Sequence, residues 1–219
     1  MLRSKTESKH AFTLVELLVV IVIISLLLAV GMPAWQSARL SADRGAGLSQ
    51  LRQIGTGIKA YATDHNGRLP GPLWPGQMPM LDPARDGRLC RDLASYLGLE
   101  IPAAPTLQPL FIPPAYKRQM GRAFLAESRT YVMNMAVSTG DAIVNPFGSL
   151  AGGSTEALLD SVPPASAWAM SDADQLHPRV VAASWKANTP PTLIYRNRRT
   201  ALYFDGHADD VSENDLRTP

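Results

Sequence analysis

The sequence predicts an α+β fold, in which one long N-terminal helix packs against a small antiparallel sheet. Three observations indicate this class. Residues 17–30 are apolar except for Ser25. Residues 48–61 then place apolar side chains at steps of three and four, as one face of a helix does. Near the C-terminus, Asp205-Gly206 separates two strand-like runs.

The first element is an apolar helix long enough to cross a membrane. Residues 12–32 are 21 residues, about 31 Å of helix against a hydrocarbon core of about 30 Å. Residues 1–11 carry three basic groups and one acidic group, and a basic flank of this kind stays in the cytoplasm. We therefore expect a single-pass membrane protein with a cytoplasmic N-terminus.

A cleaved secretory signal is the competing interpretation of this segment. The charged start and the apolar run suit it, and Ala29-Val30-Gly31 offers small residues for cleavage. Glu16 argues against it, because an acidic side chain at the membrane centre costs about 2.5–3.5 kcal/mol and such charges usually have a partner. A discarded signal has no need of that charge. The alternative to a partner for Glu16 is that its side chain reaches the lipid headgroups.

The helix is expected to continue from the membrane to about residue 63. Gly31-Met32-Pro33 predicts a kink or a locally melted turn, because proline removes a helix hydrogen bond. Gly67 and Pro70 supply the stop signals. The chain thus divides into four parts. Residues 1–11 are a basic N-terminal segment, and residues 12–32 are the membrane part of the helix. Residues 33–64 are the exposed amphipathic half of the helix, and residues 65–219 form a loop-rich head.

The head is expected to be rich in loops, since the chain has 18 Pro and 16 Gly. A short helix is predicted over residues 86–97. Strands are predicted over residues 129–137, 180–185, 192–196, 200–204 and 207–211. Asp205-Gly206 predicts a type I′ turn between the last two strands.

Charge and residue patterns exclude several function classes. Residues 1–11 account for the whole formal charge of +2, so the remainder offers no broad grip on nucleic acid. Cys90 is the only cysteine and is expected in the core. The sequence lacks the G-x-S-x-G elbow of serine hydrolases, and no nucleophile is paired with His65, His177 or His207. These histidines also lack the close spacing of zinc ligands. We expect no catalysis.

Calcium is the one cofactor that the sequence suggests. Asp172 and Asp174 form a D-x-D pair, and Asp205, Asp209 and Asp210 begin an acidic C-terminal run. Oxygen ligands of this kind suit calcium, although the twelve-residue EF-hand pattern is lacking. A solvated acidic surface without any cofactor is the alternative, and these residues favour it over a calcium site.

The N-terminal string AFTLVE, residues 11–16, resembles the processing site of type IV prepilins and type II secretion pseudopilins. The resemblance implies that a prepilin peptidase of the membrane cuts between Ala11 and Phe12, and that Phe12 is then N-methylated. It also implies that Glu16 pairs with the terminal amine of a neighbouring subunit, and that Pro33 softens the helix for filament packing. Ala11 departs from the family, which usually has Gly there.

Patches of the remaining chain resemble one pilin-like subfamily, named for an H-X9-DG motif. These are residues 51–55, 61, 64–70 and 131–134, and ALYFDGHADDV at 201–211. Asp205 and Gly206 occupy the DG of the motif. Tyr195 stands where the histidine is expected, so any role of that histidine is in doubt for this chain.

The resemblance implies a structural subunit of a type II secretion pseudopilus or a type IV pilus, not an enzyme. Its expected partners are the peptidase and N-methyltransferase, other pilin-like subunits and the assembly platform. Its expected location is the bacterial inner membrane, with the head periplasmic or extracellular. The alternative is a membrane-anchored or exported enzyme or binding protein whose N-terminus only imitates the motif.

Overall fold

The computed structural model describes residues 13–121, 127–140, 142–150, 156–212 and 215–216. The chain divides into two compact units, residues 1–41 and 42–219. The described helices are α1 (Leu14–Asp64), α2 (Leu89–Asp92) and α3 (Tyr116–Met120), with single 3-10 turns at Ser95–Leu97, Pro109–Phe111, Leu159–Ser161 and Lys186–Asn188. Together with an antiparallel sheet they confirm the predicted α+β class.

The long helix α1 spans Leu14–Asp64 and is continuous through Pro33. The locally melted turn predicted there is therefore not present: proline removes one backbone donor, and the helix is otherwise uninterrupted. At the other end, Gly67 has a positive φ of 83° and its N–H donates to the Ala62 carbonyl at 2.7 Å. This is the glycine stop that the sequence predicts.

The head contains a five-stranded antiparallel sheet with strand order β1-β4-β7-β8-β9. Its strands are β1 (Gly76–Gln77), β4 (Tyr131–Met133), β7 (Trp168–Asp172), β8 (Arg199–Tyr203) and β9 (Ala208–Val211). Two small ribbons accompany it: β2 (Met80–Leu81) with β3 (Thr106–Leu107), and β5 (Val137–Ser138) with β6 (Ile143–Val144).

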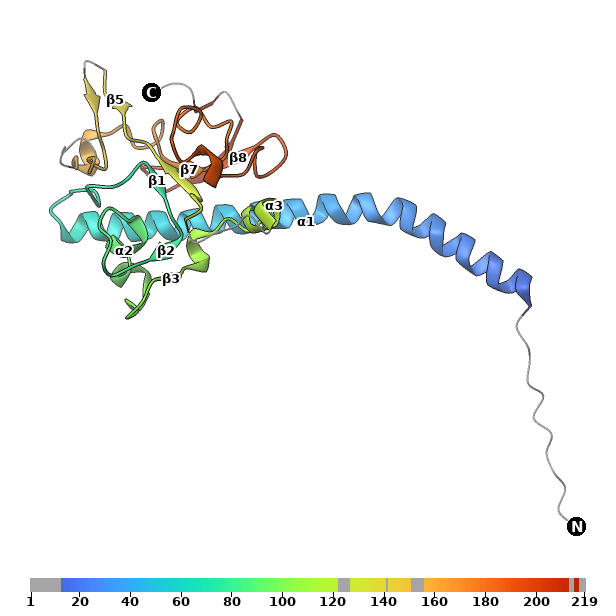
Figure 1. Ribbon diagram of the computed structural model, residues 1–219. Coiled ribbons are helices and arrows are strands. Elements are labelled where there is room, and N and C mark those ends of the chain that lie inside the picture. The colour runs from blue at the N-terminus through green and yellow to red at the C-terminus, as the bar shows by residue number, and fades with distance from the viewer. Residues whose placement is uncertain (1–12, 122–126, 141, 151–155, 213–214, 217–219) are drawn as a thin grey trace, which may run out of the picture. The chain divides into compact units, whose positions relative to one another are not determined.

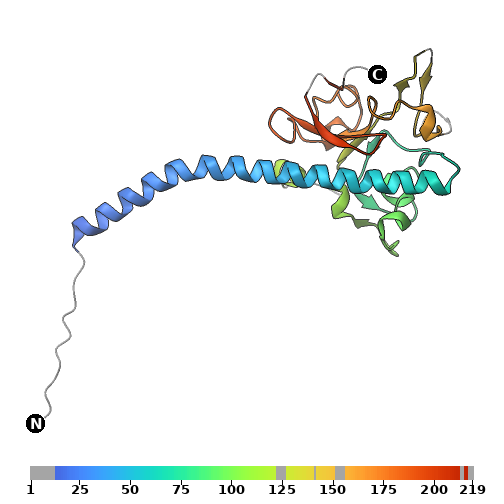
Figure 2. The same cartoon turned by 180° about the vertical axis from the view of Figure 1, so that it is seen from behind.

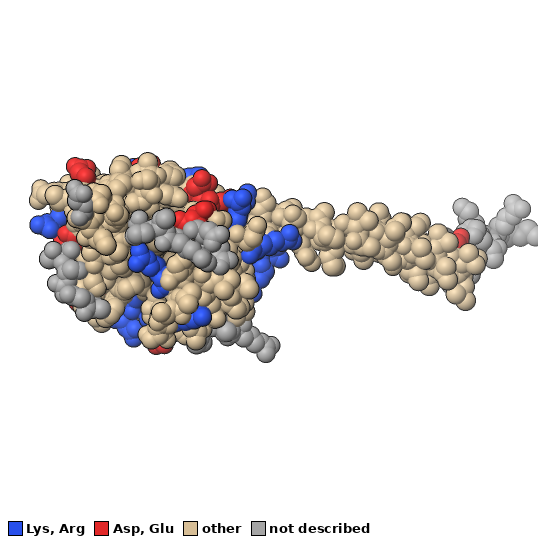
Figure 3. All heavy atoms as spheres, turned by 90° about the horizontal axis from the view of Figure 1, so that it is seen from above, with Lys and Arg blue, Asp and Glu red and all other residues tan. Residues whose placement is uncertain are grey.

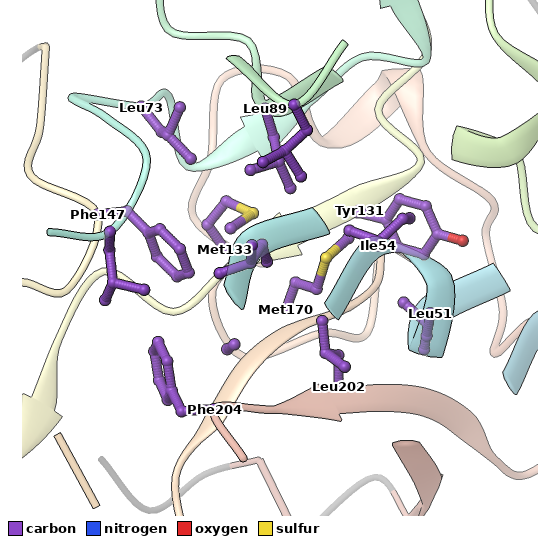
Figure 4. Close-up of a cluster of buried hydrophobic side chains, with 14 of the residues drawn as sticks. Leu51, Ile54, Leu73, Leu89, Tyr131, Met133, Phe147, Met170, Leu202 and Phe204 are labelled. Atoms are coloured by element: carbon purple, nitrogen blue, oxygen red, sulfur yellow. The ribbon is translucent and has the colours of Figure 1, made fainter. Parts of the chain in front are cut away.

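Within residues 42–219, the head packs against the second half of α1. Figures 1 and 2 show the sheet along one side of this helical stretch and the α2, β2 and β3 region along the other. Side chains alternate across each strand, so Met133 and Leu202 join the cluster around Leu51 and Ile54, which Figure 4 shows. Val132 and Ala201 join a second cluster around Trp168 and Val180.

Three glycines of α1 are points of close approach between helix and head. A Cβ at Gly47 would lie 2.5 Å from the Tyr195 hydroxyl, and one at Gly55 would lie 2.8 Å from Leu202. At Gly57 it would lie 3.0 Å from Leu97. Glycine lowers intrinsic helix stability by up to about 1 kcal/mol per residue, and here it lets the head approach the helix backbone.

The strand predictions are confirmed in part. The C-terminal hairpin forms as β8 and β9, and residues 129–137 contain β4 and the start of β5. The predicted strands at 180–185 and 192–196 are wrong. Residues 180–185 form successive turns, in which the Val180 N–H donates to the His177 carbonyl at 2.8 Å. In residues 192–196 only Tyr195 pairs, in an isolated bridge with Arg198.

Two further local predictions need correction. The hairpin turn is not type I′, because Gly206 has a positive φ of 84° while Asp205 does not. Gly206 N–H donates to the Tyr203 carbonyl, and Tyr203 N–H to the His207 carbonyl, both at 2.9 Å, which is a three-residue loop with its glycine in the left-handed region. The predicted helix at 86–97 is also broken, into α2 and the turn Ser95–Leu97.

Candidate functional site

The start of α1 is fixed by a reciprocal pair of hydrogen bonds between Thr13 and Glu16. The Thr13 hydroxyl accepts from the Glu16 N–H at 3.2 Å, and Glu16 Oε2 accepts from the Thr13 N–H at 2.9 Å and from its hydroxyl at 2.8 Å. This is a capping box, which satisfies donors that the first helical turn leaves unpaired. The Thr-x-x-Glu spacing of residues 13–16 is the sequence signal for this cap.

The surface that follows Glu16 is apolar on every side. Large apolar side chains along residues 14–32 are exposed, from 46% for Val20 to 83% for Leu14. Figure 3 shows this stretch as uncharged side chains, apart from one acidic residue near its N-terminal end. By length and composition α1 could cross a membrane, and such a surface requires an apolar environment of lipid or neighbouring helices.

The cleavage residues predicted from the sequence, Ala11 and Phe12, lie outside the described residues. Thr13 and Glu16 follow the predicted cut directly. Pro33 lies inside α1, beyond the apolar stretch. The predicted cleavage site, the Thr13–Glu16 cap and the candidate membrane span therefore follow one another in one short segment of chain.

The positions that the sequence resemblance assigns to an H-X9-DG motif contact α1 within the head. The Tyr195 side chain is 3% exposed and its hydroxyl lies beside Gly47. Lys59 Nζ donates to the Asp205 carbonyl, and Gly206 lies against the Lys59 side chain. Both ends of the motif thus hold the head on the helix, which is a packing role.

The five carboxylates considered for calcium are mostly engaged with other groups. Asp174 makes a buried two-pronged ion pair with Arg199, at 2.5 and 2.8 Å. Asp172 Oδ2 accepts from the Thr200 N–H at 2.6 Å and from its hydroxyl at 2.7 Å. Burial raises the pKa of Asp172 to about 7.

The acidic residues near the C-terminus have partners of their own. Asp210 pairs with Arg44 at 3.1 Å, Asp205 accepts from His207, and Asp209 accepts from the Asp210 N–H. Within the described part of the chain, no three His, Cys, Asp or Glu side chains are grouped to hold a metal. Calcium binding thus stays a prediction from the sequence, without support from this geometry.

The head also contains a Ser-His pair that the sequence did not indicate. His177 Nε2 lies 2.9 Å from Ser171 Oγ, and both residues are buried. Its Nδ1 accepts from the Arg179 N–H at 3.1 Å, so the ring proton is on Nε2 and points at the serine, the reverse of what a general base needs. Burial, and to a smaller extent the positive charges of Arg199 and Arg179, lowers the pKa of His177 to about 3.

The cysteine is likewise unsuited to chemistry. Cys90 is 1% exposed in the main core cluster, as the sequence predicts. Burial raises the pKa of its thiol to about 12, so the reactive thiolate is scarce at neutral pH.

Comparison with known proteins bears on the N-terminal segment. Residues 8–32 match the family model described as the prokaryotic N-terminal methylation motif. No curated protein and no solved structure matches the chain. The match covers the predicted cleavage residues, the capping box and the apolar stretch, and it leaves the H-X9-DG resemblance unconfirmed. The chain therefore carries a prepilin-type N-terminal methylation segment at residues 8–32.

Proposed function

We propose that this chain is a pilin-like structural subunit that assembles through α1 into a type II secretion pseudopilus or a type IV pilus. The observation that carries the proposal is the exposed apolar surface of residues 14–32, which lies within the matched methylation motif at residues 8–32. A membrane covers such a surface before assembly, and neighbouring helices cover it afterwards. The chain is an inner-membrane protein before assembly, with its head periplasmic.

Glu16 is the residue that orders this assembly. Only its Oε2 accepts from Thr13, and Oε1 accepts no hydrogen bond from any described residue. Removal of residues 1–11 by the peptidase leaves a terminal amine at Phe12. Oε1 can then accept from the Phe12 amine of a neighbouring subunit, so that each buried charge offsets the desolvation of the other.

Mass spectrometry of the mature N-terminus tests the processing step. A chain that begins at N-methylated Phe12 is expected, and cells without the peptidase should retain residues 1–11. A chain that begins at Met1 in normal cells, or at Met32 after signal cleavage, contradicts the proposal. Either result favours the alternative of an anchored or exported enzyme or binding protein.

Two matched variants separate the charge of Glu16 from its capping role. Glu16→Gln keeps an acceptor for Thr13 but removes the charge, whereas Thr13→Ala weakens the cap by about 1 kcal/mol and keeps the charge. We expect Glu16→Gln to insert in the membrane but to be lost from filaments, and Thr13→Ala to assemble. Filaments that contain Glu16→Gln at the normal level would remove the role of the carboxylate.

A further inference from the structure

The head contains a pocket whose lining is both cationic and aromatic. Its volume is about 460 Å³, within the range of small-molecule sites. Arg85, Arg88 and Arg129 line it together with Trp74 and Trp185, and Asp86 is the acidic residue of the lining. All of these residues belong to the unit of residues 42–219, and none belongs to the N-terminal segment described above.

The positive charge of the pocket is incompletely matched by the protein. Arg88 is 7% exposed, and among the described residues its guanidinium donates one hydrogen bond, to the Gly76 carbonyl at a long 3.4 Å. Arg129 donates to the Glu127 carbonyl at 3.2 Å. Neither guanidinium forms an ion pair within the described part of the chain, so a buried charge lacks the partner that burial normally demands.

The nearby carboxylates are already committed. Asp86 pairs with Arg91, which lies outside the lining, and Asp82 pairs with Arg85 at 3.2 Å. Burial, and to a smaller extent the positive charges of Arg129 and Arg85, lowers the pKa of Arg88 to about 10. Arg88 therefore stays charged at neutral pH, and an anion is the missing partner.

Two glycines leave room for the indole rings to pack directly on the backbone. A Cβ at Gly76 would lie 2.8 Å from the Trp185 ring, and one at Gly87 would lie 2.8 Å from the Trp74 ring. Each ring is thus packed onto bare backbone, and Trp74 still leaves 40% of its surface exposed. Flat rings supported in this way present a rigid apolar surface next to the guanidinium groups.

We propose that this pocket binds a carboxylate or phosphate group carried on a sugar ring. The anionic group would receive hydrogen bonds from Arg88 and Arg129, with the two-pronged geometry that guanidinium allows. The apolar face of the sugar ring would lie on Trp74 or Trp185. The pocket and the membrane helix are separate features, so this inference stands or falls independently of filament assembly.

The proposal is tested by ligand-observed NMR titration of the full-length chain in a detergent without a sugar headgroup. Galacturonate and glucose 6-phosphate are the two charged probes, and galactose and glucose are their neutral counterparts. Saturable binding of at least one charged probe is expected, with a Kd of about 1 mM from the usual efficiency of small ligands. Preference between the charged probes identifies the anionic group.

Variants then assign the binding to this pocket. Arg129→Gln should weaken binding about tenfold, since a hydrogen bond to a charged group has a comparable effect. Trp74→Leu should weaken it by a similar factor, because it removes the flat aromatic surface under the sugar. Arg68→Gln is the matched control, because Arg68 is an exposed arginine paired with Glu156 outside the lining, and it should bind normally. Circular dichroism checks each fold, and Arg129→Lys, which keeps the charge but loses the two-pronged geometry, replaces Arg129→Gln should that variant not fold.

Three results would overturn the proposal. One is the absence of saturable binding for both charged probes. The second is equal binding of a charged probe and its neutral counterpart, which removes the role of the arginines. The third is binding that the folded Arg129 variant and Trp74→Leu both leave unchanged, which places the ligand elsewhere.

Discussion

The two parts of α1 use the same kind of residues for opposite purposes. Along residues 14–32, large apolar side chains are at least 46% exposed. Along the part that belongs to residues 42–219, Leu51 and Ile54 are fully buried. Apolar residues that encircle a helix need an apolar solvent around it, whereas a single apolar stripe needs one packed partner.

The glycines mark the same division. Gly31 would meet no atom within 4 Å if it carried a Cβ, whereas Gly47, Gly55 and Gly57 would all meet the head. Helix propensity alone predicts that all four glycines destabilise the helix. In the buried part, the glycines instead define where another chain segment approaches the backbone, so burial decides what a glycine does.

The largest expected effect separates the two parts through one type of substitution. Leu51→Ala should lower the free energy of unfolding of the head by about 2–5 kcal/mol, because it removes a fully buried side chain. Leu27→Ala, at a position that is 66% exposed, should change it by less than about 0.5 kcal/mol. Urea unfolding of both variants in detergent measures this, and similar losses would contradict the division.

A pH effect should follow from Asp92 in the head. Burial raises the pKa of Asp92 from 3.8 to about 7, despite the opposing charge of Arg91. Between these values the folded chain keeps a proton that the unfolded chain has released, so stability falls as pH rises, by at most about 1.4 kcal/mol per pH unit. Above about pH 7 both states are ionised and the loss is complete.

Asp92→Asn removes this titration and isolates it from other groups. The variant should match the parent chain below pH 3.8 and exceed it in stability above pH 7. The quantity to compare is the difference between the two chains' free energies of unfolding at each pH. This difference is needed because the pKa of His177 is lowered to about 3. His177 therefore makes stability rise with pH in an overlapping range. Parallel pH profiles for the two chains would show that Asp92 titrates normally.

The sequence predicts those features that depend on local chemistry. The apolar helix, its stop at Gly67 and the hairpin at Asp205-Gly206 each have a signal within a few residues. The sequence does not predict strand β7, although this strand is central in the sheet and buried at every position. Its sequence, WAMSD, alternates weakly and contains Ala and Asp, which disfavour strands in isolation. Its conformation therefore depends on the neighbouring strands β4 and β8.

The candidate sites divide in the same way. The Thr13–Glu16 box could be read from spacing alone, because both residues belong to one helical turn. The pocket could not, since Trp74, Arg129 and Trp185 come from distant segments that only the folded head brings together. Residues 180–185 were mistaken for a strand because Val180 and Trp185 are apolar, yet they cover the outer face of the sheet from a series of turns.

The contact at Gly47 should be measurable as a coupling between two residues. Gly47→Ala should lower stability by about 1–3 kcal/mol, because its Cβ would overlap the buried Tyr195 hydroxyl. That hydroxyl accepts and donates no hydrogen bond within the described residues, so Tyr195→Phe should be nearly neutral. The double variant should recover part of the loss, and additive losses would show that the hydroxyl is not the obstacle.

Gly45→Ala should have the smallest effect and the opposite sign. Gly45 is two residues from Gly47 on the same helix, but a Cβ there would meet no atom within 4 Å. Alanine then gains helix propensity without a steric penalty, which should raise the free energy of unfolding by about 0.5–1 kcal/mol. A loss of stability at Gly45, measured by urea unfolding beside Gly47→Ala, would mean that position in the helix, and not contact with the head, governs these glycines.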